Sequence, residues 1–134
     1  MAGIIELDEL LKSMTPELQT GEFVFCTVVG KCVDYVHLNP LAFFVEAEGL
    51  TLILPVETAE KNQLAYESTF KQITLTVHSS LDAVGLTAAV SAKLSSYGIS
   101  ANVVAAYYHD HIFVPLEKAN EALLALKDFV AVEK

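Results

Sequence analysis

The sequence predicts a mixed α/β fold in which one split β-α-β plan occurs twice along 134 residues. In the second half, residues 70–79 alternate in polarity as a strand does, and an apolar stripe then steps by four, four and three residues as on a helix, through Leu86, Val90, Leu94 and Tyr97. Two more strand-like runs and a final helical stripe complete the order strand, helix, strand, strand, helix. We therefore expect a degenerate first half, residues 1–66, and a complete second half, residues 67–134.

Each element of the first half has its own sequence signal. An apolar repeat at three- and four-residue steps from Ile4 to Met14 predicts an amphipathic helix, which Pro16 ends. Aromatic and β-branched residues predict a buried strand, and a glycine between two apolar runs predicts a hairpin. The expected elements are a helix at 4–14, a strand at 22–29, an irregular stretch at 30–40, hairpin strands at 41–47 and 50–55, and a helix at 57–64.

In the second half, the strand at 70–79 leads into a helix from Asp82 to Tyr97. Gly98 follows, where a helix end needs a residue that tolerates the left-handed conformation. The remaining elements are a hairpin with strands at 102–108 and 112–115 around His109, Asp110 and His111, and a helix at 116–130. The sequence leaves the fourth strand of each half open: residues 129–133 could supply one, and the halves could exchange strands.

The two halves echo one another at a constant offset. A shift of 60 residues without a gap places residues 42–64 over residues 102–124, so that Pro55 meets Pro115. Hairpin, proline corner and acidic helix start recur in the same order, which indicates a degenerate internal repeat. The first half is shorter between its first strand and its hairpin, where the second half has its long helix.

The charge balance excludes several classes of function. Eight Lys and Arg stand against 17 Asp and Glu, a formal net charge of −9, so direct nucleic-acid binding is not expected. No apolar run reaches the ~20 residues of a membrane span, and the acidic start lacks the basic region of a signal peptide. We therefore expect a cytoplasmic protein in which Cys26 and Cys32 are reduced, structural thiols.

The chain carries more apolar material than a small soluble monomer needs. Hydrophobic residues make up 53% of it and charged residues only 19%, so little polar surface is available to cover the rest. We expect a large core together with an apolar surface that is buried in a homodimer or a higher homo-oligomer.

The most informative stretch is the start of the long helix, Ser79-Ser80-Leu81-Asp82-Ala83-Val84-Gly85-Leu86. A Ser or Asp cap leaves backbone N–H groups at an electropositive helix end, where a carboxylate or phosphate can bind without a basic side chain. Gly85 would let a ligand approach the backbone closely, and Asp82 could pair with an ammonium group. The alternative is an ordinary capped helix whose glycine serves packing.

Asp82-Ala83-Val84-Gly85-Leu86, followed by Leu94 and Tyr97-Gly98-Ile99-Ser100, resembles the signature of the ACT-domain family. In that family an Asp-x-x-Gly-Leu segment opens the first helix, and a Gly-Ile-Asn or Gly-Ile-Ser turn closes it. The hairpin at 106–115 is similar to that of tandem ACT pairs in amino-acid sensors. Residues 79–115 look most like a bacterial branch of small stand-alone ACT proteins without assigned function.

The resemblance implies a ferredoxin-like βαββαβ sandwich that dimerises side by side and binds ligands between one subunit's strand-to-helix loop and a neighbour's strand. The positions that match the family's site are the loop residues and one amide side chain after the helix: Asp82, Ala83, Val84, Gly85, Leu86 and Asn102. The sequence departs from the family pattern at Val84, where a proline often stands. It also departs at Ser100-Ala101-Asn102, where the asparagine stands two residues after the position that follows Gly-Ile in the family pattern.

The residues His109, Asp110 and His111 admit three interpretations. Positions two apart share one face of a strand, so both imidazoles could face a ligand while Asp110 points away. They could also hold zinc or another transition metal, with His37, His78 or a partner chain supplying a third ligand. The third interpretation is a polar hairpin tip in which Asp110 fixes the turn. We count His109 and His111 as candidate ligand-binding residues and assign no metal site.

The sequence has no Gly-x-Ser-x-Gly elbow, no phosphate-binding P-loop and no Gly-x-Gly-x-x-Gly turn. We therefore expect a non-enzymatic protein without a cofactor. Its expected function is to sense a small molecule, in the first place an amino acid, near a subunit interface. The alternative is a protein–protein interaction or dimerisation module without a metabolite ligand, and a third class is a metal-dependent enzyme.

Overall fold

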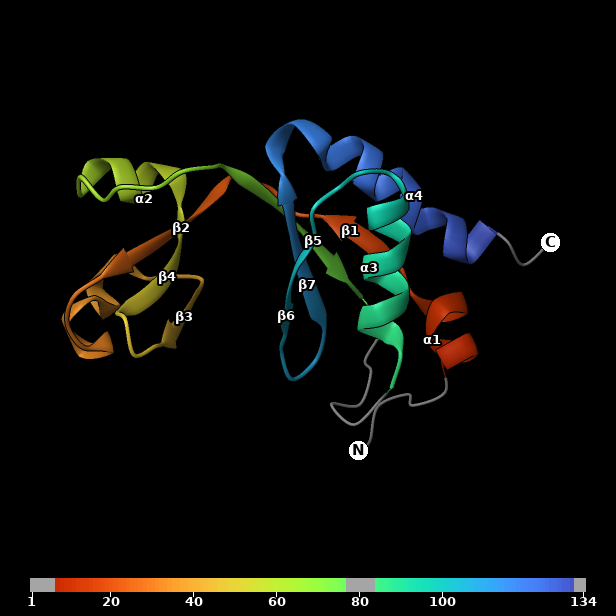
Figure 1. Cartoon of the computed structure of the whole chain (residues 1–134), viewed down its shortest axis with the longest axis horizontal. Helices are drawn as coiled ribbons and strands as arrows, with labels where there is room; N and C mark the ends of the chain where they lie inside the picture. The colour runs from red at the N-terminus through yellow and green to blue at the C-terminus, as the bar shows by residue number, and fades with distance from the viewer. Residues whose placement is uncertain (1–6, 77–83, 132–134) are drawn as a thin grey trace. The chain divides into compact units, whose positions relative to one another are not determined.

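The computed structural model describes residues 7–76 and 84–131, and the chain divides into two compact units. Unit 1 comprises residues 1–20 and 71–134, and unit 2 comprises residues 21–70. In sequence, unit 2 is therefore an insertion within unit 1. Figure 1 labels the helices and strands of both.

Unit 1 is a sheet with helices packed on one face (Figure 1). Its strands follow the order β1, β5, β7, β6, and β1 pairs antiparallel with β5 as β6 does with β7. The elements are α1 (Leu7–Ser13), β1 (Pro16–Leu18), β5 (Phe70–Leu75), α3 (Leu86–Ser96), β6 (Asn102–Ala105), β7 (Asp110–Pro115), the 3₁₀ turn η3 (Leu116–Lys118) and α4 (Ala119–Ala131).

Alternating apolar residues of the central strands and the apolar stripes of the helices form the core of unit 1. On β5 and β7, the side chains of Ile73, Leu75, Ile112 and Val114 point to the helices and are at most 1% exposed. The stripe predicted for the long helix is confirmed for Leu86, Val90 and Leu94, which α3 buries against them. It is wrong for Tyr97, which caps the end of the helix and is 41% exposed.

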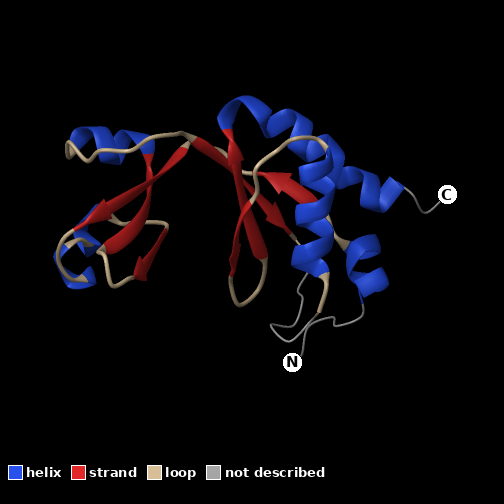
Figure 2. Ribbon diagram, in the orientation of Figure 1, coloured by secondary structure: helices blue, strands red, loops and turns tan. Residues whose placement is uncertain are grey.

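Unit 2 repeats this plan with a much thinner helical layer. Its strands follow the order β3, β4, β2, and Phe70 pairs with Phe23 at the other edge of β2. In place of a long helix, two short 3₁₀ turns follow β2 (Figure 2). The elements are β2 (Phe23–Val28), η1 (Cys32–Asp34), η2 (Val36–Leu38), β3 (Ala42–Val45), β4 (Leu50–Pro55) and α2 (Val56–Lys61).

The core of unit 2 is small and comes almost entirely from the sheet. Neither η1 nor η2 contains a buried residue, and Ala59 is the buried residue of α2. The buried cluster consists of Val24, Cys26, Leu50, Leu52, Leu54 and Ala59. Partly buried side chains pack against this cluster, namely Val28, Tyr35, Leu38, Val56, Leu64 and Tyr66.

The structure confirms the 60-residue offset between the halves. Strands β6 and β7 begin and end 60 residues after β3 and β4, and the pair Ala42–Ile53 corresponds to Asn102–Phe113. The two hairpin loops also close alike. Glu46 donates its N–H to the Gly49 carbonyl at 3.0 Å, and Ala106 donates to the His109 carbonyl at 3.1 Å.

The mixed α/β, ferredoxin-like fold with a degenerate first half is confirmed, with two corrections. The hairpin turn predicted at residues 109–111 lies at 106–109, so Asp110 belongs to β7. Residues 129–133 do not supply a strand as far as they are described, because the helical stripe carries α4 on to Ala131. The strand at the edge of β5 is instead β1.

Several predicted elements reach residues that lie outside the described part of the chain. This applies to the start of the helix expected at 4–14, the end of the strand expected at 70–79 and the start of the helix expected at 82–97. Within residues 7–76 and 84–131, no helix combines the length and the apolar character needed to cross a bilayer.

Candidate functional site

The start of α3 carries the described part of the candidate loop. Of its five residues, Val84, Gly85 and Leu86 are described, whereas Asp82 and Ala83 lie outside the described residues. Leu86 is 4% exposed and belongs to the core, and Val84 is 80% exposed. Gly85 is the N-cap residue, and its carbonyl accepts the N–H of Ala89 at 2.9 Å.

Gly85 is required by backbone conformation and by packing. Its φ of +102° lies in a region that residues with a side chain rarely adopt. A Cβ at this position would also lie 3.1 Å from Cδ2 of Leu7. The group that approaches this glycine closely is thus a side chain of α1.

Asn102 lies at the opposite end of α3 from Gly85. The helix has 11 residues and so spans about 16 Å, and Asn102 follows its C-terminal turn as the first residue of β6. Asn102 is exposed, and its Nδ2 donates to the Phe113 carbonyl at 3.2 Å. A single chain therefore does not bring Asn102 to the predicted loop.

The β6–β7 hairpin loop, in contrast, lies at the same end of unit 1 as the start of α3 (Figure 1). His109 is the last loop residue, and His111 follows in β7 beside the end of β5, where its ring contacts Gln72 and Thr74. The structure thus brings His109 and His111 to the end of the unit where Gly85 lies.

The His111 ring contacts two polar side chains of β5. Its Nδ1 lies 3.1 Å from Nε2 of Gln72 and 3.0 Å from Oγ1 of Thr74. Burial, with a further contribution from His109, lowers the pKa of His111, while Asp110 acts in the opposite direction. The ring is thus held neutral near neutral pH.

Asp110 is a buried carboxyl group that the sequence analysis placed in a turn. It is 9% exposed, and strand alternation puts it on the helix-facing side of β7 with Ile112 and Val114. Burial raises the pKa of Asp110, while His111 and His109 oppose the rise. The 60-residue offset could have revealed this burial, because it places Asp110 over the core residue Leu50.

This end of unit 1 therefore combines two complementary electrostatic features. The N-terminal end of α3 is electropositive because the peptide dipoles align along the helix. Asp110 begins β7 directly after the hairpin loop, and strand alternation puts its carboxyl on the helix-facing side of the sheet. Together they can attract a molecule with one anionic and one cationic group. In the described part of the chain, no three His, Cys, Asp or Glu side chains converge into a possible metal site.

Comparison with known proteins gives a family and a close structural match. One ACT-domain family model matches residues 2–71, and a second ACT-domain model matches residues 67–128. A Vibrio cholerae protein of unknown function, described as a possible transport protein, is 57% identical in sequence. The match covers 92% of this chain and 95% of that chain, with a TM-score of 0.86.

More distant structures share the fold. An Agrobacterium tumefaciens protein is 12% identical over 87% of this chain and 89% of its own, with a TM-score of 0.69. The ligand-free regulatory subunit of aspartate kinase from Thermus thermophilus is 10% identical over 84% of this chain and 95% of its own, with a TM-score of 0.58. No curated protein sequence matches this chain.

Proposed function

This chain belongs to the ACT-domain family, and on that premise we propose that it is a non-enzymatic regulatory module that binds an amino acid at the start of α3. Two ACT domains in tandem support a regulatory, ligand-binding protein in general. The similarity of its fold to an aspartate kinase regulatory subunit agrees with that role. The amino-acid ligand and the place where it binds are the specific parts of the proposal.

The observation that carries the proposal is the buried carboxyl of Asp110, the first residue of β7 after the hairpin loop. A buried ionisable group that does not serve the apolar core is typical of a binding site. The ligand carboxylate would lie on the free N–H groups around Val84–Leu86, and its ammonium group would face Asp110, with Asp82 as a second acidic partner. His111 contacts Gln72 and Thr74 on the other face of the sheet, so of the two histidines only His109, in the hairpin loop, would border the site.

Asn102 has a place in this site only if a second chain supplies it. Asn102 begins β6, after the C-terminal end of α3, whereas Gly85 stands at the N-terminal end of this helix, which spans about 16 Å. In a homodimer, the partner's β6 could bring its amide to the loop. Ligand binding would then stabilise the dimer, and occupancy would be coupled to assembly.

A thermal-shift screen of the twenty amino acids tests the proposal, with protein that mass spectrometry shows to be free of copurified ligand. A specific ligand at 100 times its Kd should raise the Tm by about 5–10 °C. Asp82→Ala and Asp110→Asn should each reduce this rise. Glu117→Gln, an exposed acidic residue of η3, serves as the matched control and should leave the rise unchanged.

A flat screen on ligand-free protein would count against an amino-acid sensor. An equal rise in Asp110→Asn and in the wild type would place any bound amino acid elsewhere. The dependence of the oligomeric mass on the ligand, measured by analytical ultracentrifugation, tests the interface part of the proposal separately.

A second candidate function is dimerisation or protein–protein interaction without a metabolite. It is favoured by β3 of unit 2, where Phe43, Phe44 and Val45 are 48%, 70% and 70% exposed. Among the described residues, no strand pairs with the outer edge of β3. This function predicts a stable dimer that Phe44→Glu dissociates, together with no response to any amino acid.

A further inference from the structure

Helix α1 of unit 1 lies outside the plan of strands and helices that the two units share. It precedes β1, it has seven residues, and it contacts both α3 and α4. Unit 2 begins at residue 21, and only residues 21 and 22 precede β2 in it, so it has no counterpart of α1. The internal repeat therefore does not account for this helix.

The side chain of Leu7 in α1 occupies the space beside Gly85. Apart from the neighbouring backbone, the three atoms nearest to a Cβ built on Gly85 all belong to Leu7, with Cδ2 at 3.1 Å and Cδ1 at 3.7 Å. Figure 1 shows α1 beside the end of α3 at which that helix begins. The bare side of the glycine, from which a ligand could approach the backbone, is thus occupied by α1.

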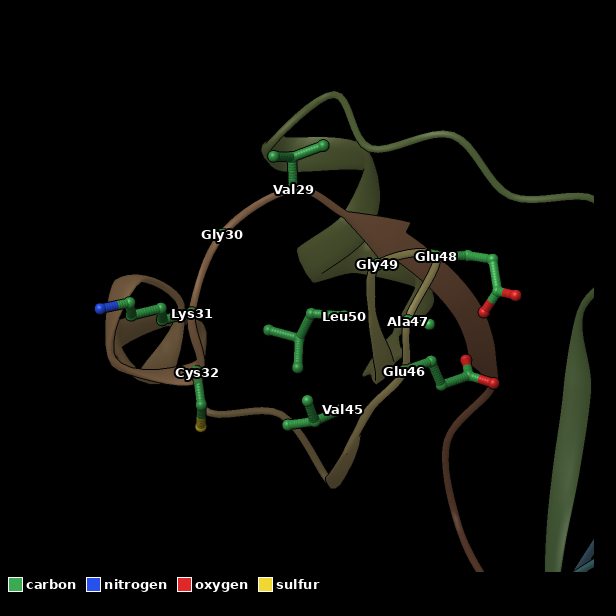
Figure 3. A pocket seen from close by; sticks show the side chains of 10 residues that line it. All are labelled: Val29, Gly30, Lys31, Cys32, Val45, Glu46, Ala47, Glu48, Gly49 and Leu50. Carbon is green, nitrogen blue, oxygen red and sulfur yellow. The ribbon is translucent and has the colours of Figure 1, made fainter.

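The corresponding connection of unit 2 is closed by its own residues. Gly30, between β2 and the β3–β4 hairpin, also has a positive φ, and a Cβ there would lie 3.1 Å from both Asp34 Oδ2 and Tyr35 Cε2. Figure 3 shows Gly30 within this short turn. Asp34 and Tyr35 cannot move away from Gly30 unless the turn itself unfolds. At Gly85, by contrast, the covering group belongs to a separate helix.

Helix α1 is attached in a way that lets it move without its neighbours. Of its described side chains, Leu7 and Leu11 pack against the core of unit 1, and both are only partly buried. Seven residues are too few for a helix that is stable alone, which needs ~12–15. Met14, which follows the helix, is 1% exposed and holds the chain in the core just before β1. α1 can therefore leave α3 while β1 stays paired with β5.

We propose that α1 is an autoinhibitory helix, whose Leu7 side chain occupies the approach to Gly85 until a ligand displaces it. The inference rests on the function proposed above, because it describes how that same site opens. Docking of α1 raises the apparent Kd, which equals the intrinsic Kd divided by the undocked fraction. Ligand binding would in turn release residues 7–13, and occupancy of the site would be reported by a freed helix.

The affinity part is tested on the full chain by thermal shift with each of the twenty amino acids, followed by calorimetric titration of the amino acid with the largest shift. Leu7→Ala weakens docking and should lower the Kd about tenfold. Leu11→Ala also weakens docking but leaves the group beside Gly85 in place, and it should lower the Kd as well. Glu9→Gln, at an exposed side chain of the same helix, is the matched control and should leave the Kd unchanged.

The outcomes separate this inference from the function on which it rests. An amino acid that binds wild type and Leu7→Ala with equal Kd would overturn autoinhibition and leave the proposed function standing. A lower Kd in Leu7→Ala but not in Leu11→Ala would show a local steric contact in place of movement of α1, and would also overturn it. A flat screen with every protein would overturn both proposals, whereas a response in Leu7→Ala alone would support both.

Hydrogen exchange of the wild type covers the case in which the variants do not fold. In an equimolar mixture of the twenty amino acids, the hydrogen-bonded amides of α1 should exchange about tenfold faster than without it, because bound molecules hold α1 undocked. The amides of the first turn of α3 should exchange more slowly. Slower exchange of α1 would show that it closes over the bound amino acid, and unchanged exchange of α1 beside a slowed α3 would show that it does not move. Either result would overturn the inference.

Discussion

Units 1 and 2 share a hairpin, residue for residue, but not a helical layer. The strands, the register and the hydrogen bond that closes the loop recur at an offset of 60 residues. Between the first strand and this hairpin, unit 1 has the buried stripe of α3, whereas unit 2 has two turns with no buried residue. The difference teaches that the hairpin is retained without the helix that covers its counterpart, and that partly buried side chains such as Tyr35 and Leu38 cover the core of unit 2 instead.

The two units also differ at one equivalent position of the hairpin. Leu50 in unit 2 is an apolar core residue, and Asp110 in unit 1 is a buried carboxyl, on the same face of corresponding strands. A buried carboxyl stabilises a fold less than leucine does, because it loses hydration without gaining apolar contact. Unit 1 therefore carries a polar group in the place where unit 2 carries a core leucine.

The largest expected effect is the difference in stability loss between a substitution in α3 and one in η2. Leu94→Ala, at a side chain of α3 that is 0% exposed, should lower the free energy of unfolding by about 2–5 kcal/mol. Val36→Ala in η2, where the side chain is 55% exposed, should change it by less than about 0.5 kcal/mol. Urea unfolding followed by circular dichroism measures both. Similar losses in the two variants would mean that η2 supports its unit as strongly as α3 does.

A smaller effect is expected at the glycines on either side of α3. Gly85→Ala should cost about 2 kcal/mol, since it strains a residue at φ +102° and places a Cβ 3.1 Å from Leu7. Gly98→Ala should cost about 1 kcal/mol, because at φ +72° its Cβ would meet no atom within 4 Å. Thermal unfolding compares the two. If Leu7→Ala does not reduce the difference between the stability losses of Gly85→Ala and Gly98→Ala, then packing against α1 is not the cause of that difference.

The smallest effect concerns the pH dependence that Asp110 gives to unit 1. Burial raises the folded-state pKa of Asp110, so the folded protein holds this proton more tightly than the unfolded chain. Its contribution to stability is therefore present at low pH and is lost as the pH rises through the folded-state pKa. Asp110→Asn should remove this loss and raise the free energy of unfolding at pH 7 by about 1 kcal/mol.

Urea unfolding from pH 3.5 to pH 7 gives the free energies of unfolding of wild type and Asp110→Asn. The difference between the two at each pH is the effect of the carboxyl. The comparison between the two proteins is needed because His111 contributes a slope of the opposite sign. Its pKa is lowered by burial, so its contribution grows as the pH rises toward its unfolded value. A variant that is less stable than wild type at pH 7 would show that the ionised carboxyl of Asp110 is stabilised by its surroundings.

The predictable parts of the fold are those with local signals. The stripe of α3, the strand pairs of both hairpins and the internal offset follow from periodicity and turn residues. Strand β1 was missed because it has only three residues, begins with Pro16 and is defined by its pairing with the distant β5. The hairpin turn was misplaced because Tyr107 and Tyr108 have the character of strand residues, yet stand in the loop at 63% and 64% exposure.

The candidate site was predicted less completely than the fold. Sequence patterns selected Gly85 and the histidines of the hairpin, and the structure places these at one end of unit 1. Burial of Asp110 depends on the register of β7 against β6, which the misplaced turn had obscured. The position of Asn102 at the far end of α3 follows from helix length, which a motif match does not take into account.

The discontinuity of unit 1 has a consequence for how the chain folds. Residues 7–18, which include strand β1 and the buried Met14 (1% exposed), are synthesised before unit 2. Strand β5 and the helices against which residues 7–18 pack are synthesised after unit 2. Unit 2 is contiguous and can close first, pairing Phe23 with Phe70. This closure shortens the effective loop between β1 and β5 and lowers the entropic cost of their later pairing. If the inserted unit forms first, it therefore lowers the entropic cost of completing the larger one.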